Sequence, residues 1–384
     1  MKMKRKDRQM PEEFTDRKPL HIIVTSDMHY LSPRLTNGGT AFWKLMEQGD
    51  GKYTEAGQMI MEAFVQAVQE EKPDAVLICG DLTFNGELLS LQDMAAYCRR
   101  LKEAGSRVFV ICGNHDIENR TAAAYFGDKV RAAESVTAQT FLSLMAPYGY
   151  DDALFRDPDS CSYAAALRDD LWLLVLDANT PECPGSLRTE TLQWAETVLQ
   201  QAQKADARVI SMSHQNVLVQ NEMMYRGFVI NNHEETEALL KKYDVLLHLS
   251  GHCHLSHVSV SGGLSDICTE SLVIWPLSYG SLRVDPSRGT FVYESRSLNI
   301  LQEESRHRFD ETMRRMVMPT LMGKGVPQEK IPAMISLASE VSALYFAGRR
   351  MDRAFYLNST AWRDWCEWCG GSFWHNYIKL ILET

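Results

Sequence analysis

Several apolar runs of the sequence end in carboxylate, amide or imidazole side chains, which are groups that can bind metal ions. In chain order these candidate donors are Asp27, His29, Asp81, Asn114, His214, His252 and His254. Oxygen and imidazole ligands suit hard and borderline divalent cations, and the set holds more donors than one ion needs. Two ions that share a carboxylate would use all of them, and such a pair, about 3.5–4 Å apart, suits phosphoryl transfer. The residue types therefore predict a two-metal site.

The spacing of the donors supports a shared location. Asp27 and His29 are two residues apart, and so are His252 and His254. Side chains at i and i+2 lie on one side of an extended backbone, so each pair faces a single direction. In α/β folds, ligands bind at the sheet edge where strands end. Any one of these residues alone would also fit a turn or a buried histidine with a local partner, but the whole set favours a site.

The elements that position these residues alternate between short apolar runs and longer amphipathic stretches. The runs at 21–26, 75–80 and 108–113 indicate buried strands, and the stretches between them have helical periodicity, which gives two β-α-β crossovers. Later runs, including the one at 272–275, lie closer together, which favours antiparallel pairing. The pattern predicts an α/β fold with two mixed sheets flanked by helices.

From about residue 300 onward the sequence has helical periodicity only and ends in a tail rich in tryptophan. The apolar faces of these helices need a partner surface. We therefore expect an α/β domain at 18–299 and an all-helical domain at 300–384. Cys366 and Cys369 in the tail have the spacing of a zinc or redox pair, but the other half of a zinc site is missing, so we favour buried thiols.

The ordered motifs resemble those of the calcineurin-like metallophosphoesterase family. They are Asp27-x-His29, Gly80-Asp81, Gly113-Asn114-His115-Asp116, His214 and Gly251-His252-x-His254. The resemblance implies a four-layer α/β/β/α sandwich of two mixed β-sheets and a dinuclear centre of Mn, Fe or Zn. It also implies hydrolysis of phosphoester bonds, so the 18–299 segment would be the catalytic domain.

The resemblance also implies a role for each motif residue. Asp27, His29 and His254 would bind one metal ion, and Asn114, His214 and His252 would bind the other. Asp81 would bridge the two ions. His115 would be the catalytic residue that contacts the phosphate and protonates the leaving group.

Composition restricts the partners. The chain has 384 residues, with 40 basic and 50 acidic side chains and a formal net charge of −10. This balance argues against a nucleic acid polymer or an anionic membrane as a partner, and it allows a small phosphorylated substrate. Residues 1–20 have no apolar signal-peptide core, and no run is long enough to span a bilayer. The nine cysteines, an odd number, suit a reducing compartment, so we expect a cytoplasmic location.

Two long loops are the candidates for substrate contacts. The loop at 30–53 carries Phe42, Trp43 and Tyr53, which could stack a nucleobase or pack locally. The loop at 215–232 carries Arg226, a candidate phosphate contact that could equally be a solvated side chain.

These loops favour a phosphodiesterase that acts on a small substrate such as a cyclic nucleotide. The alternatives are a phosphomonoesterase or nucleotidase, and a non-catalytic interaction scaffold with the same fold. Two further residues, His257 and Asn179, are weaker candidates for a place around the metal ligands.

Overall fold

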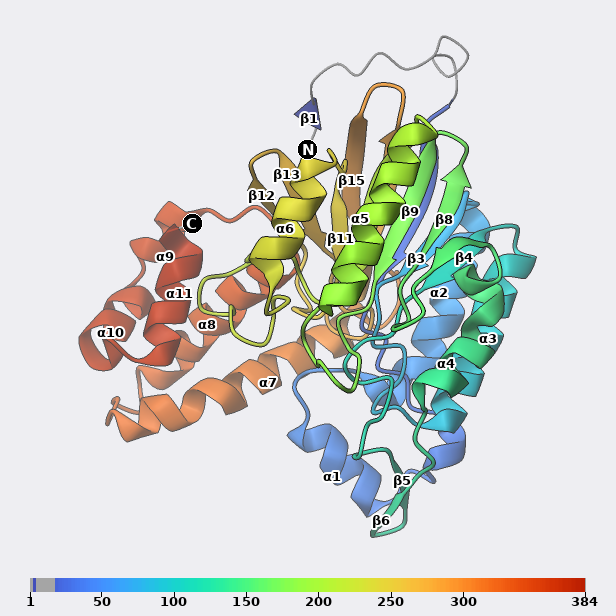
Figure 1. Ribbon diagram of the computed structural model, residues 1–384. Helices are drawn as coiled ribbons and strands as arrows, with labels where there is room; N and C mark the ends of the chain where they lie inside the picture. The colour runs from blue at the N-terminus through green and yellow to red at the C-terminus, as the bar shows by residue number, and fades with distance from the viewer. Residues whose placement is uncertain (1–2, 5–17, 384) are drawn as a thin grey trace.

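The computed structural model describes residues 3–4 and 18–383 (Figure 1). Most of the segment 1–20, on which the cytoplasmic expectation partly rests, lies outside the described residues. Two mixed β-sheets form the centre of the molecule. The first has the strand order β1 (Met3–Lys4), β15 (Thr290–Ser297), β14 (Ser278–Asp285), β2 (Leu20–Thr25), β3 (Ala75–Ile78) and β4 (Arg107–Val110). The second has the order β12 (His257–Ser261), β13 (Leu264–Cys268), β11 (His248–Ser250), β10 (Arg208–Ser213), β9 (Leu171–Leu176), β8 (Tyr163–Arg168) and β7 (Ala153–Arg156).

Helices cover the outer face of each sheet. The first sheet packs against α2 (Gly57–Glu71), α3 (Leu88–Glu103) and α4 (Ala138–Met145), and the second against α5 (Thr189–Lys204) and α6 (His233–Lys242) (Figure 1). Strands β2, β3 and β4 are parallel and are connected through α2 and α3, as the two expected crossovers require. The four-layer α/β/β/α fold with two mixed sheets is confirmed.

Strand β9 shows how the sequence fills both cores. Leu173 and Val175 pack in the core between the sheets, whereas Leu174 and Leu176 pack against α5 and α6. Alternate residues of a strand point to opposite faces, so a continuously apolar run serves two cores. The strand is therefore buried on both sides, as its sequence indicates.

One expected strand is wrong. Residues 272–275 form a buried turn, and the neighbouring strands are β13 and β14, on either side of it. The run is apolar because Leu272 and Val273 are fully buried in the main core. Pro276 follows and has no backbone N–H, so the ladder of β14 begins only at Ser278. An apolar run therefore indicated burial here and not a strand.

The chain beyond β15 is helical. It forms α7 (Gln302–Gly323), α8 (Ile331–Phe346), α9 (Arg353–Leu357), α10 (Thr360–Cys369) and α11 (Phe373–Glu383), at the left of Figure 1. Their apolar faces enclose a second core, which also takes in Ile274 and Trp275 from the turn before β14. Within this part of the chain Cys369 is buried, but Cys366 is exposed, contrary to expectation. The division into domains at 299/300 stays a prediction.

Smaller elements surround the strand ends at the lower edge of the sheets in Figure 1. These are α1 (Thr40–Gln48), the hairpin of β5 (Ala123–Phe126) and β6 (Lys129–Ala132), the 3₁₀ turns Pro33–Leu35 and Thr54–Ala56, and the π-helical turn Ala146–Tyr150. None of the helices in the described ranges combines the length and the apolar character that crossing a membrane requires.

Candidate metal centre

The loops that follow β2 and β3 are joined to each other by backbone hydrogen bonds. The N–H of Asp27 donates to the carbonyl of Gly80 at 3.0 Å, and the N–H of His29 donates to that of Asp81 at 2.9 Å. These bonds continue the strand pairing past the last ladder residues, Thr25 and Ile78. The side chains of both loops are therefore delivered to one place at the edge of the sheet.

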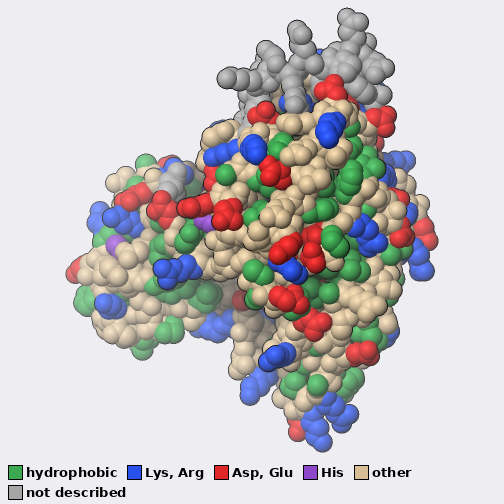
Figure 2. Space-filling model, in the orientation of Figure 1, with side chains coloured by type: hydrophobic (Ala, Val, Ile, Leu, Met, Phe, Trp, Pro, Cys, Tyr) green, Lys and Arg blue, Asp and Glu red, His purple; other side chains and the backbone are tan. Residues whose placement is uncertain are grey.

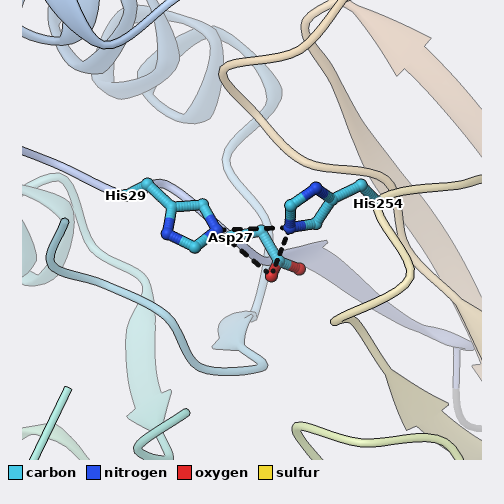
Figure 3. A group of neighbouring side chains, drawn as sticks. All are labelled: Asp27, His29 and His254. Carbon is cyan, nitrogen blue, oxygen red and sulfur yellow. Dashed lines mark hydrogen bonds and ion pairs between the residues drawn. The ribbon is translucent and has the colours of Figure 1, made fainter. Parts of the chain in front are cut away.

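A first group of donors comprises Asp27, His29 and His254 (Figure 3). The Nε2 atoms of the two histidines are 3.2 Å apart and point toward one another. Asp27 Oδ1 lies 3.2 Å from Nε2 of His254 and 3.7 Å from Nε2 of His29. Asp27 also connects the two sheets, because its Oδ2 accepts a hydrogen bond from the N–H of His252 at 2.9 Å.

A second group comprises Asp81, Asn114, His214 and His252. Nε2 of His214 lies 3.0 Å from Oδ1 of Asn114, 3.1 Å from Nδ1 of His252 and 3.3 Å from Oδ2 of Asp81. Three lone-pair donors therefore converge on the same nitrogen. One proton on His214 cannot satisfy all of them, whereas a cation at the centre of the group would.

Asp81 belongs to both groups through the same oxygen atom. Its Oδ2 is 3.3 Å from Nε2 of His214 and 3.6 Å from Nε2 of His29. Its other oxygen, Oδ1, accepts a hydrogen bond from the N–H of His115 at 2.8 Å. The carboxylate is thus held in the orientation that a bridging position between two ions requires.

The ring nitrogens that face the centre are set by hydrogen bonds on the other side of each ring. Nδ1 of His214 donates to the carbonyl of Cys79 at 2.8 Å, and Nε2 of His252 donates to that of Gly227 at 2.8 Å. These bonds place the proton away from the centre and leave the opposite nitrogen with a lone pair. The opposite ring nitrogen of each histidine is therefore the one that faces the centre and is available to a cation.

Burial determines how the histidines titrate without bound ions. Burial, with a further contribution from the charge of Lys52, lowers the pKa of His29 to about 3, and burial lowers that of His252 to about 4. Burial would also lower the pKa of His214, but the adjacent Asp81 carboxylate reverses the effect and raises it to about 10. His29 and His252 are thus uncharged at neutral pH.

Metal ions fit this constellation. Asp27 Oδ1 is buried and accepts no hydrogen bond from any described residue, although it is aimed between two imidazoles. An uncompensated buried carboxylate oxygen is costly, and a cation would remove that cost. His, Asp and Asn donors suit first-row transition metals such as Mn, Fe or Zn.

The backbone of the site is strained at most of the donors. Five of them have positive φ angles, from 39° to 67°: Asp27, His29, Asp81, His252 and His254. This left-handed conformation costs non-glycine residues on the order of 1–3 kcal/mol each, and such residues cluster at functional sites. Sequence reasoning did not indicate this strain.

Three glycines next to the donors are required by close packing. A Cβ on Gly113 would lie 2.1 Å from Asp81 Oδ1, one on Gly251 would lie 2.6 Å from Asp27 Oδ2, and one on Gly80 would lie 2.7 Å from Nδ1 of His214. Any side chain at these positions would displace a donor. The glycines directly before Asp81, Asn114 and His252 were visible in the sequence, and this packing explains them.

His115 lies beside both groups, with its ring edge-on to that of His29 at a centroid distance of 4.8 Å. Its Nδ1 donates to the carbonyl of Phe84 at 2.8 Å, so Nε2 is the nitrogen left for a substrate. His29, Asp81 and His115 also form a cluster whose ligand atoms lie within 4.8 Å of one another. The position therefore suits either proton transfer or metal binding.

Asp116, the last residue of the motif Gly113-Asn114-His115-Asp116, has a structural role. It accepts hydrogen bonds from the N–H groups of Leu82, Thr83 and Gly113 at 3.1, 2.8 and 2.8 Å. Burial raises its pKa to about 6. Asp116 thus ties the loop after β4 to the loop after β3.

The predicted substrate residues Trp43 and Arg226 are both exposed. Trp43 is 47% exposed on α1, whereas Phe42 is buried against Leu35 and Tyr125. Arg226 is exposed, and its side chain makes no hydrogen bond or ion pair with the described residues. A substrate role for Trp43 and Arg226 stays a prediction.

The two weaker candidates have other partners. Asn179 is buried, donates to the carbonyl of Cys112 at 3.3 Å and accepts from Gln215 at 2.6 Å, so it braces the ends of β4 and β10. His257 contacts Gln220 through Nδ1 at 2.9 Å and packs near Tyr345. Neither contact involves a donor of the centre.

Sequence reasoning missed two charged residues near the centre, Asp50 and Lys52. Both line a cavity of about 190 Å³ together with Asn85 and His115. The loop 30–53 was singled out for its aromatic residues, and nothing in its pattern distinguished one lysine from the others in the chain. The position of Asp50 and Lys52 beside His115 depends on how the loop 30–53 folds back over the strand ends.

Comparison with known proteins identifies the family of the chain. The model of the calcineurin-like phosphoesterase family matches residues 20–256. Among solved structures, the chain is similar to a dimetal phosphatase from Danio rerio, with 15% identity over 73% of this chain and 97% of that chain and a TM-score of 0.50. It is also similar to the protein TT1561 of Thermus thermophilus, with 15% identity, 73% and 100% coverage and a TM-score of 0.42.

A search of curated proteins gave no match. The family match includes all seven donors and covers more than half of the chain. The protein is therefore a member of the calcineurin-like phosphoesterase family and a metal-dependent phosphoesterase.

Proposed function

We propose that this enzyme is a two-metal phosphodiesterase that acts on a small substrate such as a cyclic nucleotide. The observation that carries the two-metal assignment is the position of Asp81 Oδ2, which is 3.3 Å from His214 and 3.6 Å from His29, one histidine in each donor group. In this proposal Asp27, His29 and His254 bind one ion, Asn114, His214 and His252 bind the other, and Asp81 bridges them.

The electrostatics of the site support a diester. Among the described residues, the cavity beside His115 contains one lysine, Lys52, which is paired with Asp50 at 2.8 Å. A phosphodiester carries one negative charge and a monoester about two at neutral pH, so a site with few fixed cations suits the diester better. The small cavity and the net charge of −10 argue against a polynucleotide.

Two bound metal ions would lower the pKa of water and polarise the phosphoryl group. The residues of the chain hold the geometry around this chemistry. Asp81 keeps the two donor groups together, and its Oδ1 fixes the His115 backbone. His115 holds its Nδ1 proton on the carbonyl of Phe84, so a second proton on Nε2 can be given to the departing alkoxide.

The experiment pairs metal analysis with matched substrates. The purified protein is analysed for metal content and assayed on bis(p-nitrophenyl) phosphate against p-nitrophenyl phosphate, and on cyclic AMP against AMP. We expect two ions per chain and higher kcat/KM on the diesters. A preference for the monoesters would make the enzyme a phosphomonoesterase or nucleotidase. Two bound ions without hydrolysis of any of the four substrates would favour the scaffold.

His115→Ala tests the role of the imidazole. We expect the variant to keep both ions and to lose about 10²–10⁴ in rate on alkyl esters, because an alkoxide needs a proton to leave. The loss on nitrophenyl esters should be smaller, since nitrophenolate leaves without one. Loss of a metal ion would instead make His115 a ligand, and an equal loss on both ester classes would make it a phosphate-binding residue.

A further inference from the structure

A small cavity lies next to the candidate metal centre. Its volume is about 190 Å³, and the residues that line it include Met46, Gly49, Asp50, Lys52 and His115. His115 forms the wall nearest to the donors, since its ring contacts that of His29. In the described part of the chain, Lys52 is the one lysine or arginine among the lining residues, and it comes from the segment 46–55.

The Lys52 side chain is turned inward. It is only 12% exposed, whereas the side chain of its ion-pair partner Asp50 is 58% exposed. Lys52 and His115 line the same cavity, so the lysine side chain lies beside the site and not in bulk solvent. A lysine of a purely solvated surface pair would have its ammonium group in water instead.

The segment 46–55 is anchored by helix α7 of the C-terminal region. Arg308 donates to the carbonyl of Met46 at 3.1 Å, pairs with the carboxylate of Glu55 and lies over the ring of Tyr53 at 5.4 Å. Arg315, two turns further along α7, donates to the carbonyls of Glu47 and Gly49. The two arginines thus bind the segment on both sides of Lys52 and Asp50.

The contact bridges two parts of the molecule. Figure 2 shows a hollow between the C-terminal helices, at the left, and the body of the protein. A groove of about 770 Å³ lies between α7 and the segment, and Glu47, Tyr53, Arg308 and Arg315 line it. The segment therefore forms the wall between this groove and the cavity beside His115.

We propose that Lys52 is a substrate-binding residue that contacts the phosphoryl oxygens, and that α7 positions it through Arg308 and Arg315. Lys52 and His115 line one cavity, and His115 contacts His29 of the centre, so a phosphate bound there would be within reach of both side chains. A cation held by the protein before substrate arrives needs no reorganisation on binding. The proposal rests on the proposed function, since it assumes that the phosphate binds at the donors.

Lys52→Met is the first test. We expect KM for bis(p-nitrophenyl) phosphate and the inhibition constant of inorganic phosphate both to rise about tenfold, because one charge-assisted contact is lost. Metal content should equal that of the unaltered enzyme, and Lys52→Arg should restore most of the phosphate binding. The matched control is Lys44→Met, which removes the same charge from an exposed position on α1.

The second test separates positioning from general charge. Arg315→Gln removes the bonds to Glu47 and Gly49, whereas Arg314→Gln removes only a pair with Glu311 on the same helix. We expect Arg315→Gln to weaken phosphate binding and Arg314→Gln to leave it unchanged. The double variant Arg315→Gln/Lys52→Met should bind phosphate no more weakly than Lys52→Met alone, because both changes act on one contact.

Binding of inorganic phosphate to the metal-loaded enzyme, measured by calorimetry, keeps this inference distinct from the proposed function. If the enzyme hydrolyses neither ester class but Lys52→Met weakens phosphate binding, the proposed function fails and the role of Lys52 stands. If Lys52→Met binds phosphate as Lys44→Met does, Lys52 has no substrate contact. If Arg315→Gln behaves as Arg314→Gln does, α7 does not position it.

Discussion

Asp81 shows most directly how single atoms define the centre. Its two oxygens have separate partners, with Oδ1 on the His115 backbone and Oδ2 between His214 and His29. Asp81 falls in two clusters of candidate ligands, one with His29 and His115 and the other with His214 and His252. Its charge is also what makes His214 more basic than burial alone would allow.

Asp81→Asn therefore should lower the content of both metal ions together and reduce activity in parallel. An amide offers one neutral oxygen in place of a shared anionic carboxylate, so each ion loses part of its binding energy. Metal content per chain and turnover number are the measurements. A variant with two ions per chain and near-normal turnover would contradict the bridging assignment.

The glycines beside the donors make a second prediction at the residue scale. Gly113→Ala should abolish metal binding, since its methyl group would meet Asp81 Oδ1 at 2.1 Å. Gly323→Ala is the control, because nothing lies within 4 Å of a Cβ there and its φ is not positive. The check is metal content together with thermal unfolding. Equal metal content and equal thermal stability of the two variants would show that the loop after β4 can shift to accommodate a methyl group.

At the scale of elements, α1 shows why the sequence alone did not assign the roles of its two aromatic residues. Phe42 and Trp43 are adjacent, but a helix turns successive residues to different sides. Phe42 is 6% exposed and packs against the β5–β6 hairpin, whereas Trp43 is 47% exposed. Their separate roles depend on where the helix docks.

Phe42→Ala should destabilise the protein by about 3 kcal/mol, the cost of a large cavity in a packed cluster. Trp43→Ala should change stability little. Urea unfolding of both variants is the measurement. If Trp43 stacks a base, Trp43→Ala raises KM for cyclic AMP and leaves KM for bis(p-nitrophenyl) phosphate unchanged. A stability loss at Trp43 as large as that at Phe42 would contradict this division.

The strands and the donors could be predicted because each is indicated by a short, local pattern in the sequence. The runs that became β2, β3 and β10 are mostly apolar, and each ends within a few residues of a donor. Lys52 could not be predicted, because its position depends on Arg308 and Arg315, which lie some 250 residues away in the chain. The run 272–275 failed because burial in a turn and burial in a strand require the same apolar residues.

At the scale of the whole molecule, the C-terminal helices pack against the turn that precedes β14. Their core includes Ile274 and Trp275, and Arg306 and Arg349 lie over the Trp275 ring at 4.9 and 5.1 Å. The turn before β14 therefore packs both in the core between the two sheets and in the core of the C-terminal helices.

A chain truncated after residue 299 should accordingly be less stable and should aggregate, since Ile274 and Trp275 would be exposed. It should also have a raised KM, because Arg308 and Arg315 are gone. Melting temperature, light scattering and kinetics are the measurements. Limited proteolysis of the full chain tests the predicted boundary near 300. A truncated chain with unchanged folding and kinetics would contradict the division.

The first sheet has a consequence for how the protein is made. Strand β2 is paired on one side with β14, so that Ile22 lies beside Leu282. At roughly 5–20 residues per second of synthesis, Ile22 leaves the ribosome on the order of ten seconds or more before its partner exists. Until then the nascent chain has an unpaired strand edge at β2. Asp27 and His29 have been synthesised, but His252 and His254 have not. The enzyme can therefore acquire its metal ions only after most of the polypeptide has been translated.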